Sequence, residues 1–111
     1  MNIEDISMAR QYRTPYSEGY LVRAGEEVIA RIDLHYGQES SYATIVLHKD
    51  MAEEEVFDLI MLVDDNVVLS AEMPREDFYV TVYRGEEIGF YTDEFLEEHR
   101  RRRGLSENGR D

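Results

Sequence analysis

Three residues in the first half of the chain are candidates for acid–base chemistry: Asp33, His35 and Tyr42. Asp33 and His35 stand two apart in a stretch that alternates apolar and polar residues, so in a strand they share one face. A carboxylate, an imidazole and a phenol within reach of one another can exchange protons with a bound molecule. Cross-strand polar pairing on a solvated sheet face explains the same residues, and no nucleophile or oxyanion donor accompanies them.

The alternation of residue types predicts the strands that hold these side chains. Residues 27–36 and 42–48 alternate with a period of two, and Gly37–Ser40 reads as a four-residue loop between them. With that loop, His35 opposes Tyr42, and all aliphatic residues share the other face. The predicted aliphatic pairs are Leu34 with Ala43, Ile32 with Ile45 and Ala30 with Leu47. A shift by one residue would place Ile45 and Leu47 beside charged residues, so the first register is favoured.

A helix is predicted from Asp50, with Glu53 three residues later in a capping-box arrangement. Its expected apolar stripe consists of Ala52, Val56, Leu59, Ile60, Val63 and Val67. The opposite side is expected to carry a ridge of charge. The candidate partner-binding residues there are Asp50, Glu54, Asp58 and Asp65, with Met61 nearby as an adaptable apolar anchor beside Phe57. Two carboxylates, Asp64 and Asp65, oppose the helix dipole, so either the helix ends before them or their charge serves a partner or ion.

The formal net charge of the 111 residues is −13, and it is concentrated in one region. Residues 50–99 contain two arginines against sixteen acidic residues, whereas residues 100–111 contain five arginines against two. This charge disfavours direct binding to nucleic acid, whose affinity rests on phosphate contacts. The run Arg100–Arg103 favours the C-terminus of a helix, or pairs with the acidic region of the same chain or of a second copy. The second of these pairings would produce a homodimer, which the sequence allows.

The sequence lacks the signals that are typical of several classes of protein. It has no cysteine, so disulfides, thiol nucleophiles and Cys-ligated metals are excluded. Histidine spacings typical of metal sites and glycine-rich nucleotide motifs are missing, and we expect neither metal nor cofactor. The acidic first residues do not resemble a signal peptide, and the apolar runs are too short for a membrane helix. These features predict a cytoplasmic protein without membrane contact.

The remaining elements complete a predicted single α+β domain over residues 16–103. Residues 1–15 are expected to be a weak helix or a flexible arm ended by Pro15, and 104–111 a disordered tail. Residues 18–23 form a further strand, 78–83 and 88–91 a second hairpin, and Thr92 or Asp93 caps a last helix. The predicted order is (α)βββαββα, an antiparallel sheet with helices on one face. In element order, this resembles the bacterial type III secretion chaperones and their relatives.

Two functions are consistent with these patterns. The first is a non-enzymatic protein-interaction domain, such as an adaptor, chaperone, inhibitor or antitoxin-like protein, that binds a partner with a basic surface through its acidic helix. The second is a small ligand-binding domain or enzyme that uses Asp33, His35 and Tyr42.

Overall fold

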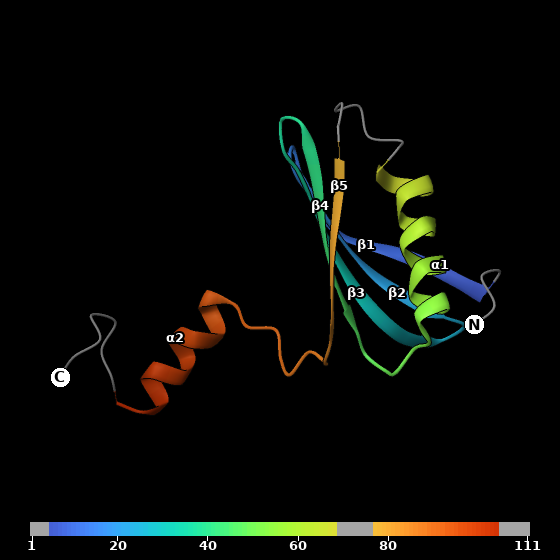
Figure 1. Cartoon of the computed structure of the whole chain (residues 1–111). Helices are drawn as coiled ribbons and strands as arrows, with labels where there is room; N and C mark the ends of the chain where they lie inside the picture. The colour runs from blue at the N-terminus through green and yellow to red at the C-terminus, as the bar shows by residue number, and fades with distance from the viewer. Residues whose placement is uncertain (1–4, 69–76, 105–111) are drawn as a thin grey trace.

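A five-stranded sheet with one helix packed across it forms the body of the protein (Figure 1). The computed structural model describes residues 5–68 and 77–104. Strand order in the sheet follows the chain, from β1 to β5. The elements are β1 (Ile6–Thr14), β2 (Ser17–Ala24), β3 (Glu27–Tyr36), β4 (Ser40–Leu47), α1 (Glu53–Val63), the π-helical turn η2 (Asp64–Val68), β5 (Asp77–Arg84) and α2 (Asp93–Arg102). The α+β class predicted from the sequence is confirmed.

The first element is a strand, where the sequence had predicted a weak helix or flexible arm over 1–15. β1 pairs antiparallel with β2, and Pro15 lies in the two-residue turn between Thr14 and Ser17. Ile6 and Met8 stand two apart and both pack against the core, which is the spacing of a strand. The register shifts between Arg10 and Tyr12, where one extra residue forms a bulge. The bulge interrupts the alternation, which explains why the strand pattern is weak in the sequence.

The pairing of β3 with β4 confirms the predicted register. Leu34 lies opposite Ala43, Ile32 opposite Ile45, Ala30 opposite Leu47 and His35 opposite Tyr42. The preceding turn between β2 and β3 contains Gly25, whose φ of 63° lies in the left-handed region that glycine adopts without steric cost. The four antiparallel strands therefore form a continuous meander.

After this meander, the chain crosses the sheet and returns in the same direction. β5 pairs in parallel with β4, with Ile45 next to Val82. Parallel neighbours need a long crossover connection, and the segment that contains α1 provides it. The predicted second hairpin is therefore wrong: residues 85–92 form no strand, although Gly85 still donates a backbone hydrogen bond to the Leu47 carbonyl at 2.8 Å.

The core lies between the inner sheet face and α1. It is formed by aliphatic side chains of β2, β3 and β4 together with Leu59 and Val63 of the helix, both of which are almost completely buried. Val56 and Ile60 pack against the same cluster, which confirms most of the predicted stripe, but Ala52 is exposed and the Val67 side chain lies outside those described. The α-helix ends at Val63, before Asp64 and Asp65, and continues as a single π-helical turn.

The N-terminus of α1 differs from the prediction at Asp50. The capping residue is Ala52, whose backbone N–H donates to Oε1 of Glu55 at 3.0 Å. Glu53, Glu54 and Glu55 occupy the first turn, where their charge suits the helix dipole. Asp50 lies before the helix, so it belongs to the loop and not to the helical ridge.

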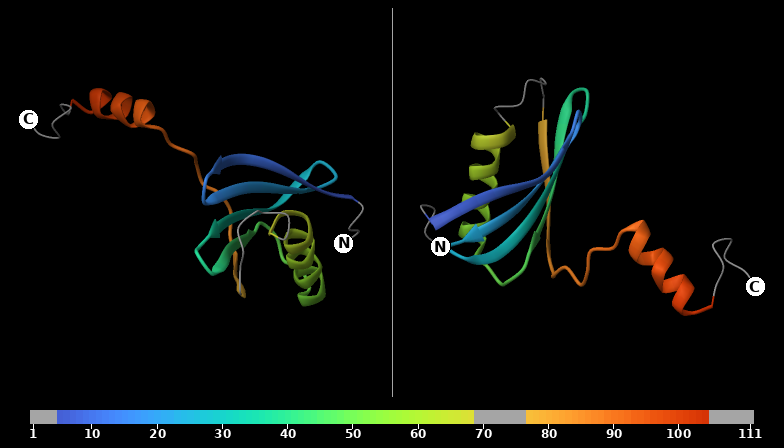
Figure 2. Two further views of the ribbon diagram at one scale, coloured as in Figure 1. Left: turned by 90° about the horizontal axis from the view of Figure 1, so that it is seen from above. Right: turned by 180° about the vertical axis from the view of Figure 1, so that it is seen from behind.

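The last helix does not pack on the sheet. Residues 85–92 lead away from the end of β5, and α2 lies on the opposite side of the sheet from α1 (Figure 2). Thr92 caps it as predicted, with its hydroxyl oxygen accepting from the Phe95 backbone N–H at 3.2 Å. None of its residues is buried. The predicted tail from 105 onward lies outside the described residues, and no helix among those described is long and apolar enough to span a membrane.

Candidate functional site

The solvent-facing side of α1 brings together most of the predicted partner-binding residues. At about 100° per residue, Glu54, Asp58, Met61 and Phe57 share one side of the helix, and Asp65 follows in the π-helical turn. Phe57 is 53% exposed and Met61 is 55% exposed. We call these five residues the α1 surface. The α1 surface therefore combines two large, solvent-exposed apolar side chains with three carboxylates, and it contains no basic residue.

Asp50 stands apart from the α1 surface because it has a charged partner of its own. It accepts a hydrogen bond from Arg84 at the end of β5, and both side chains are largely exposed. An exposed ion pair of this kind contributes little to stability, roughly 0–1 kcal/mol. Its effect on the candidate site is electrostatic, since it neutralises one of the four charges that the sequence assigned to the ridge.

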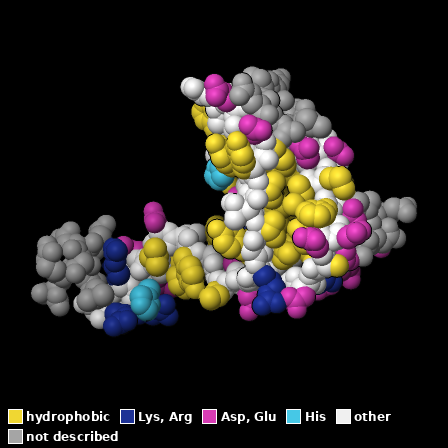
Figure 3. All heavy atoms as spheres, in the orientation of Figure 1, with side chains coloured by type: hydrophobic (Ala, Val, Ile, Leu, Met, Phe, Trp, Pro, Cys, Tyr) yellow, Lys and Arg dark blue, Asp and Glu magenta, His cyan; other side chains and the backbone are white. Residues whose placement is uncertain are grey.

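An apolar strip continues from the α1 surface toward β5. Figure 3 shows hydrophobic side chains exposed between β5 and α1, with carboxylates along the helix side. On the strand, Val82 is 36% exposed and Val80 is partly buried; on the helix, Ile60 is partly buried beside Phe57. Contiguous exposed apolar area with a polar rim is typical of protein-interaction sites.

On the outer sheet face, Asp33 is held by two neighbours. Arg31 donates to both carboxylate oxygens, at 3.2 Å from Nε and 3.3 Å from the terminal nitrogen, and the Tyr12 hydroxyl donates to Oδ1 at 2.7 Å. Burial and the bond to Asp33 raise the pKa of Tyr12 above its ordinary value. Asp33 is thus an orienting acceptor for Arg31 and Tyr12, and its oxygens are already engaged.

Gly19 explains how Tyr12 reaches Asp33. The three residues lie in one cross-strand row, since Tyr12 pairs with Gly19 and Gly19 pairs with Asp33. A Cβ atom at Gly19 would overlap the Tyr12 ring. The missing side chain therefore provides the space over which the ring lies, and the hydroxyl extends to the carboxylate on the next strand.

His35 and Tyr42 form a separate row on the same face. They are opposite one another, both are exposed, and Tyr42 stacks on Tyr79 of β5 with ring centroids 5.4 Å apart. Tyr79 donates to Asp77 at 3.3 Å, and the negative charge of Asp77 raises the pKa of Tyr79. Asp33 and His35 share a face as predicted, but Asp33 contacts Tyr12 and Arg31 whereas His35 faces Tyr42.

A hollow of about 540 Å³ opens on the outer face beside the Asp33 group. Leu21 and Val28 line it with apolar side chains, together with Tyr12, Arg31 and Phe90. Glu86 and Glu87 of the segment after β5 also line it. The lining of the hollow combines apolar and charged side chains, which suits an amphipathic ligand or side chain.

The inner face contains a buried carboxylate that sequence analysis did not single out. Glu18 is 7% exposed and accepts bonds of 2.7 Å from Tyr20 and Tyr36 and of 3.4 Å from Arg10. Burial raises the pKa of Glu18, but these three bonds outweigh it and hold the pKa below its ordinary value. Burial and the bond to Glu18 raise the pKa of Tyr36. Every oxygen of this carboxylate is satisfied within the fold, which indicates a structural role.

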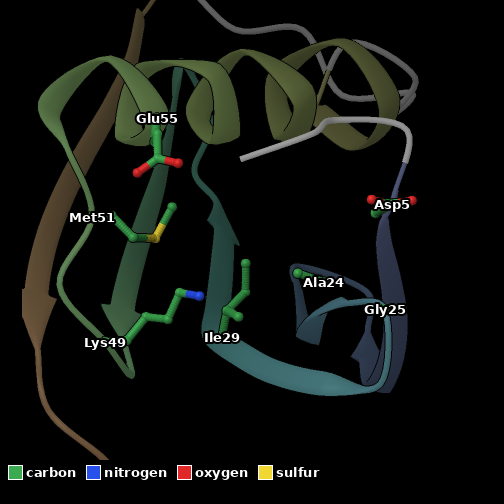
Figure 4. A pocket seen from close by; sticks show the side chains of 7 residues that line it. All are labelled: Asp5, Ala24, Gly25, Ile29, Lys49, Met51 and Glu55. Atoms are coloured by element: carbon green, nitrogen blue, oxygen red, sulfur yellow. The ribbon is translucent and has the colours of Figure 1, made fainter.

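A second hollow, of about 320 Å³, lies beneath the N-terminal end of α1 (Figure 4). Ile29 and Met51 supply apolar walls, and Lys49, Asp5 and Glu55 supply charge. Lys49 also lies 3.5 Å from Glu27 in an exposed ion pair. Among the described residues, no group of three or more acidic or histidine side chains is arranged to hold a metal ion.

Tyr12, Arg31 and the exposed segment after β5 are the site residues that the sequence analysis missed. The two-residue spacing of Arg31 and Asp33 was itself a signal, because strand residues two apart are neighbours on one face. Tyr12 had no such signal, since its placement depends on β1 being a strand and on the bulge at residue 11.

Comparison of the chain with protein-family models, curated protein sequences and solved structures finds no match. The expected resemblance to secretion chaperones therefore rests on element order alone. Within the described residues, four strands precede α1 and one follows it, where the predicted outline had three and two.

Proposed function

We propose that this protein is a non-enzymatic interaction domain whose α1 surface receives a basic, amphipathic segment of a partner protein. The observation that carries the proposal is the half-exposed pair Phe57 and Met61 on a helix that bears carboxylates and no basic side chain. Residues 50–68 contain no lysine or arginine at all. An apolar centre with a rim of one charge sign is the arrangement by which interfaces combine affinity with orientation.

The chemistry of the partner follows from that arrangement. Apolar side chains of the partner would cover Phe57 and Met61, while arginines or lysines approach Glu54, Asp58 and Asp65. The carboxylates raise the association rate by long-range attraction, and this part of the affinity falls with ionic strength. Methionine adapts its shape to its neighbours, which suits a surface that accommodates a helix from another protein.

The test is affinity capture of host proteins on the full chain, in parallel with two charge-matched variants. Glu54→Lys with Asp58→Lys reverses the charge of the α1 surface. Glu26→Lys with Glu39→Lys changes the net charge equally at exposed turn positions. We expect basic proteins to be retained by the wild-type chain and the turn variant and lost from the α1 variant. Equal retention by all three chains would contradict the proposal.

The outer hollow supports a second candidate function, the binding of a small amphipathic ligand. Its basis is the hollow of about 540 Å³ that Tyr12, Arg31 and Phe90 line; His35 and Tyr42 are not among its lining residues. A ligand there would shift the NMR signals of Tyr12 and His48 together, since both line the hollow. If Tyr12→Phe and Arg31→Gln left the binding of every ligand found by such a screen unchanged, this candidate would be excluded.

A further inference from the structure

The segment after β5 contains the two most exposed large hydrophobic residues of the described chain. Ile88 is 94% exposed and Phe90 is 81% exposed, although both are large hydrophobic residues. Tyr91, Phe95 and Leu96 continue this exposure into α2, each at roughly half of its full area. We call residues 86–103 the arm. Large apolar side chains arranged in this way mark a surface that is covered by another molecule.

We propose that the arm of one copy docks on the α1 surface of a second copy of this chain. The inference rests on the proposed function, because it names an occupant for the same surface. The observation behind it is the complementarity of two exposed helix faces. The arm combines the apolar Phe95 and Leu96 with a run of arginines, and the α1 surface combines the apolar Phe57 and Met61 with carboxylates.

Charge and direction favour an antiparallel arrangement of the two helices. The last turn of α2 contains Arg100, Arg101 and Arg102, and the first turn of α1 contains Glu53, Glu54 and Glu55. Placing these two ends together matches opposite charges and aligns the helix dipoles favourably. Arg100 already pairs with Glu97 at 3.5 Å, whereas Arg102 and Arg103 are exposed and, at about 100° per residue, lie on the same side as Phe95 and Leu96.

The position of the arm favours docking on a second copy rather than on the α1 surface of the same chain. α1 covers the inner face of the sheet, whereas the arm leaves from the end of β5 and α2 lies beyond the outer face (Figure 2). The sheet therefore separates α2 from the α1 surface of its own chain. Because the two complementary surfaces are different, copies join either by reciprocal exchange of arms or head to tail in an open chain.

The test uses charge reversal on each side of the contact in the full-length protein. We prepare Glu54→Arg with Asp58→Arg on the α1 surface, and Arg102→Glu with Arg103→Glu on the arm, and measure mass by light scattering and sedimentation. The wild-type chain should self-associate as its concentration rises. Each variant alone should have a dissociation constant for self-association at least about tenfold higher. An equimolar mixture of the two variants restores complementary charges at both contacts and should associate like wild type.

A proximity measurement accompanies the mass measurement, and it is simple because the chain contains no cysteine. A Met61→Cys chain mixed with a Leu96→Cys chain should form a mixed disulfide under mild oxidation, while a Glu39→Cys chain mixed with Leu96→Cys should not. Neither Met61 nor Leu96 is buried, so these variants retain the core.

Two results would overturn the inference. One is a wild-type chain that remains monomeric throughout, and the other is an association that both charge-reversed variants retain. Neither result bears on the proposed function, whose readout is the capture of a different, basic protein. Conversely, self-association without any captured basic protein would contradict the proposed function and leave the docking of the arm supported.

Discussion

Tyr36 donates a hydrogen bond of 2.7 Å to the buried carboxylate of Glu18 across the inner face of the sheet. The bond joins β3 to β2, and it leaves the second oxygen of Glu18 to Tyr20 and Arg10. A buried charge is tolerated only when hydrogen bonds replace its lost hydration. The stability of this end of the sheet therefore depends on a small polar group within an otherwise aliphatic core.

Removing the Tyr36 hydroxyl should destabilise the protein measurably. We expect Tyr36→Phe to lower the free energy of unfolding by about 1.5–3 kcal/mol, because a hydrogen bond to a buried charged group is lost. Urea denaturation followed by circular dichroism measures the change. Tyr16→Phe is the matched control, since Tyr16 is 64% exposed, and it should change stability by less than about 0.5 kcal/mol.

The same pair predicts how stability varies with pH. The pKa of Glu18 is lower in the folded state than its ordinary value of 4.5, so its contribution is fully present above pH 4.5 and is lost as pH falls below 4.5 through the lower pKa of the folded state. The pKa of Tyr36 is raised above 10.0, so its contribution is present below pH 10.0 and is lost at higher pH. Urea midpoints across the pH range should fall at both ends, and the Glu18→Gln variant should show a smaller fall at the acidic end.

Gly19 and Tyr12 should behave as a coupled pair. We expect Gly19→Ala to destabilise the protein by about 1–3 kcal/mol, because the added methyl group displaces the Tyr12 ring from its place over the glycine. In a Tyr12→Ala background, the same substitution should lower the free energy of unfolding by clearly less. A double-mutant cycle by urea denaturation gives the coupling energy, and additive effects would contradict a direct contact between the Tyr12 ring and position 19.

Two neighbouring residues of α1 should separate stability from binding. Leu59 is fully buried, so Leu59→Ala should lower the free energy of unfolding by about 2–5 kcal/mol. Met61 is 55% exposed, so Met61→Ala should change stability by less than about 0.5 kcal/mol. Met61→Ala should nevertheless weaken capture of a basic partner. Thermal denaturation and the capture assay measure the two effects, and unchanged capture would remove Met61 from the interface.

The cap of α2 should affect that helix alone. Thr92→Ala removes the acceptor for the Phe95 backbone N–H and should cost about 1 kcal/mol of local helix stability. Because α2 buries no residue, the urea midpoint of the whole protein should stay unchanged while amide exchange in residues 93–102 accelerates. A fall in the urea midpoint would show that α2 supports the core.

Local patterns in this sequence were sufficient to predict several features of the fold. The alternation in residues 27–36 and 42–48 determined the β3–β4 register, because only one register places Ile32 and Ile45 on the buried face together. The apolar spacing of Val56, Leu59 and Val63 determined the side of α1 that packs on the sheet. The acidic residues of the α1 surface followed from the same periodicity.

Other features depend on contacts between distant segments, so only the tertiary structure decided them. β1 is a strand because β2 pairs with it, and its bulge conceals the period of two. β5 is parallel to β4 because the chain crosses the sheet before it returns, which no local residue pattern specifies. The partners of Asp33 and Glu18 come from neighbouring strands. Sequence periodicity determines which face of an element is apolar, whereas the fold determines what that face meets, and in α2 it leaves every residue unburied.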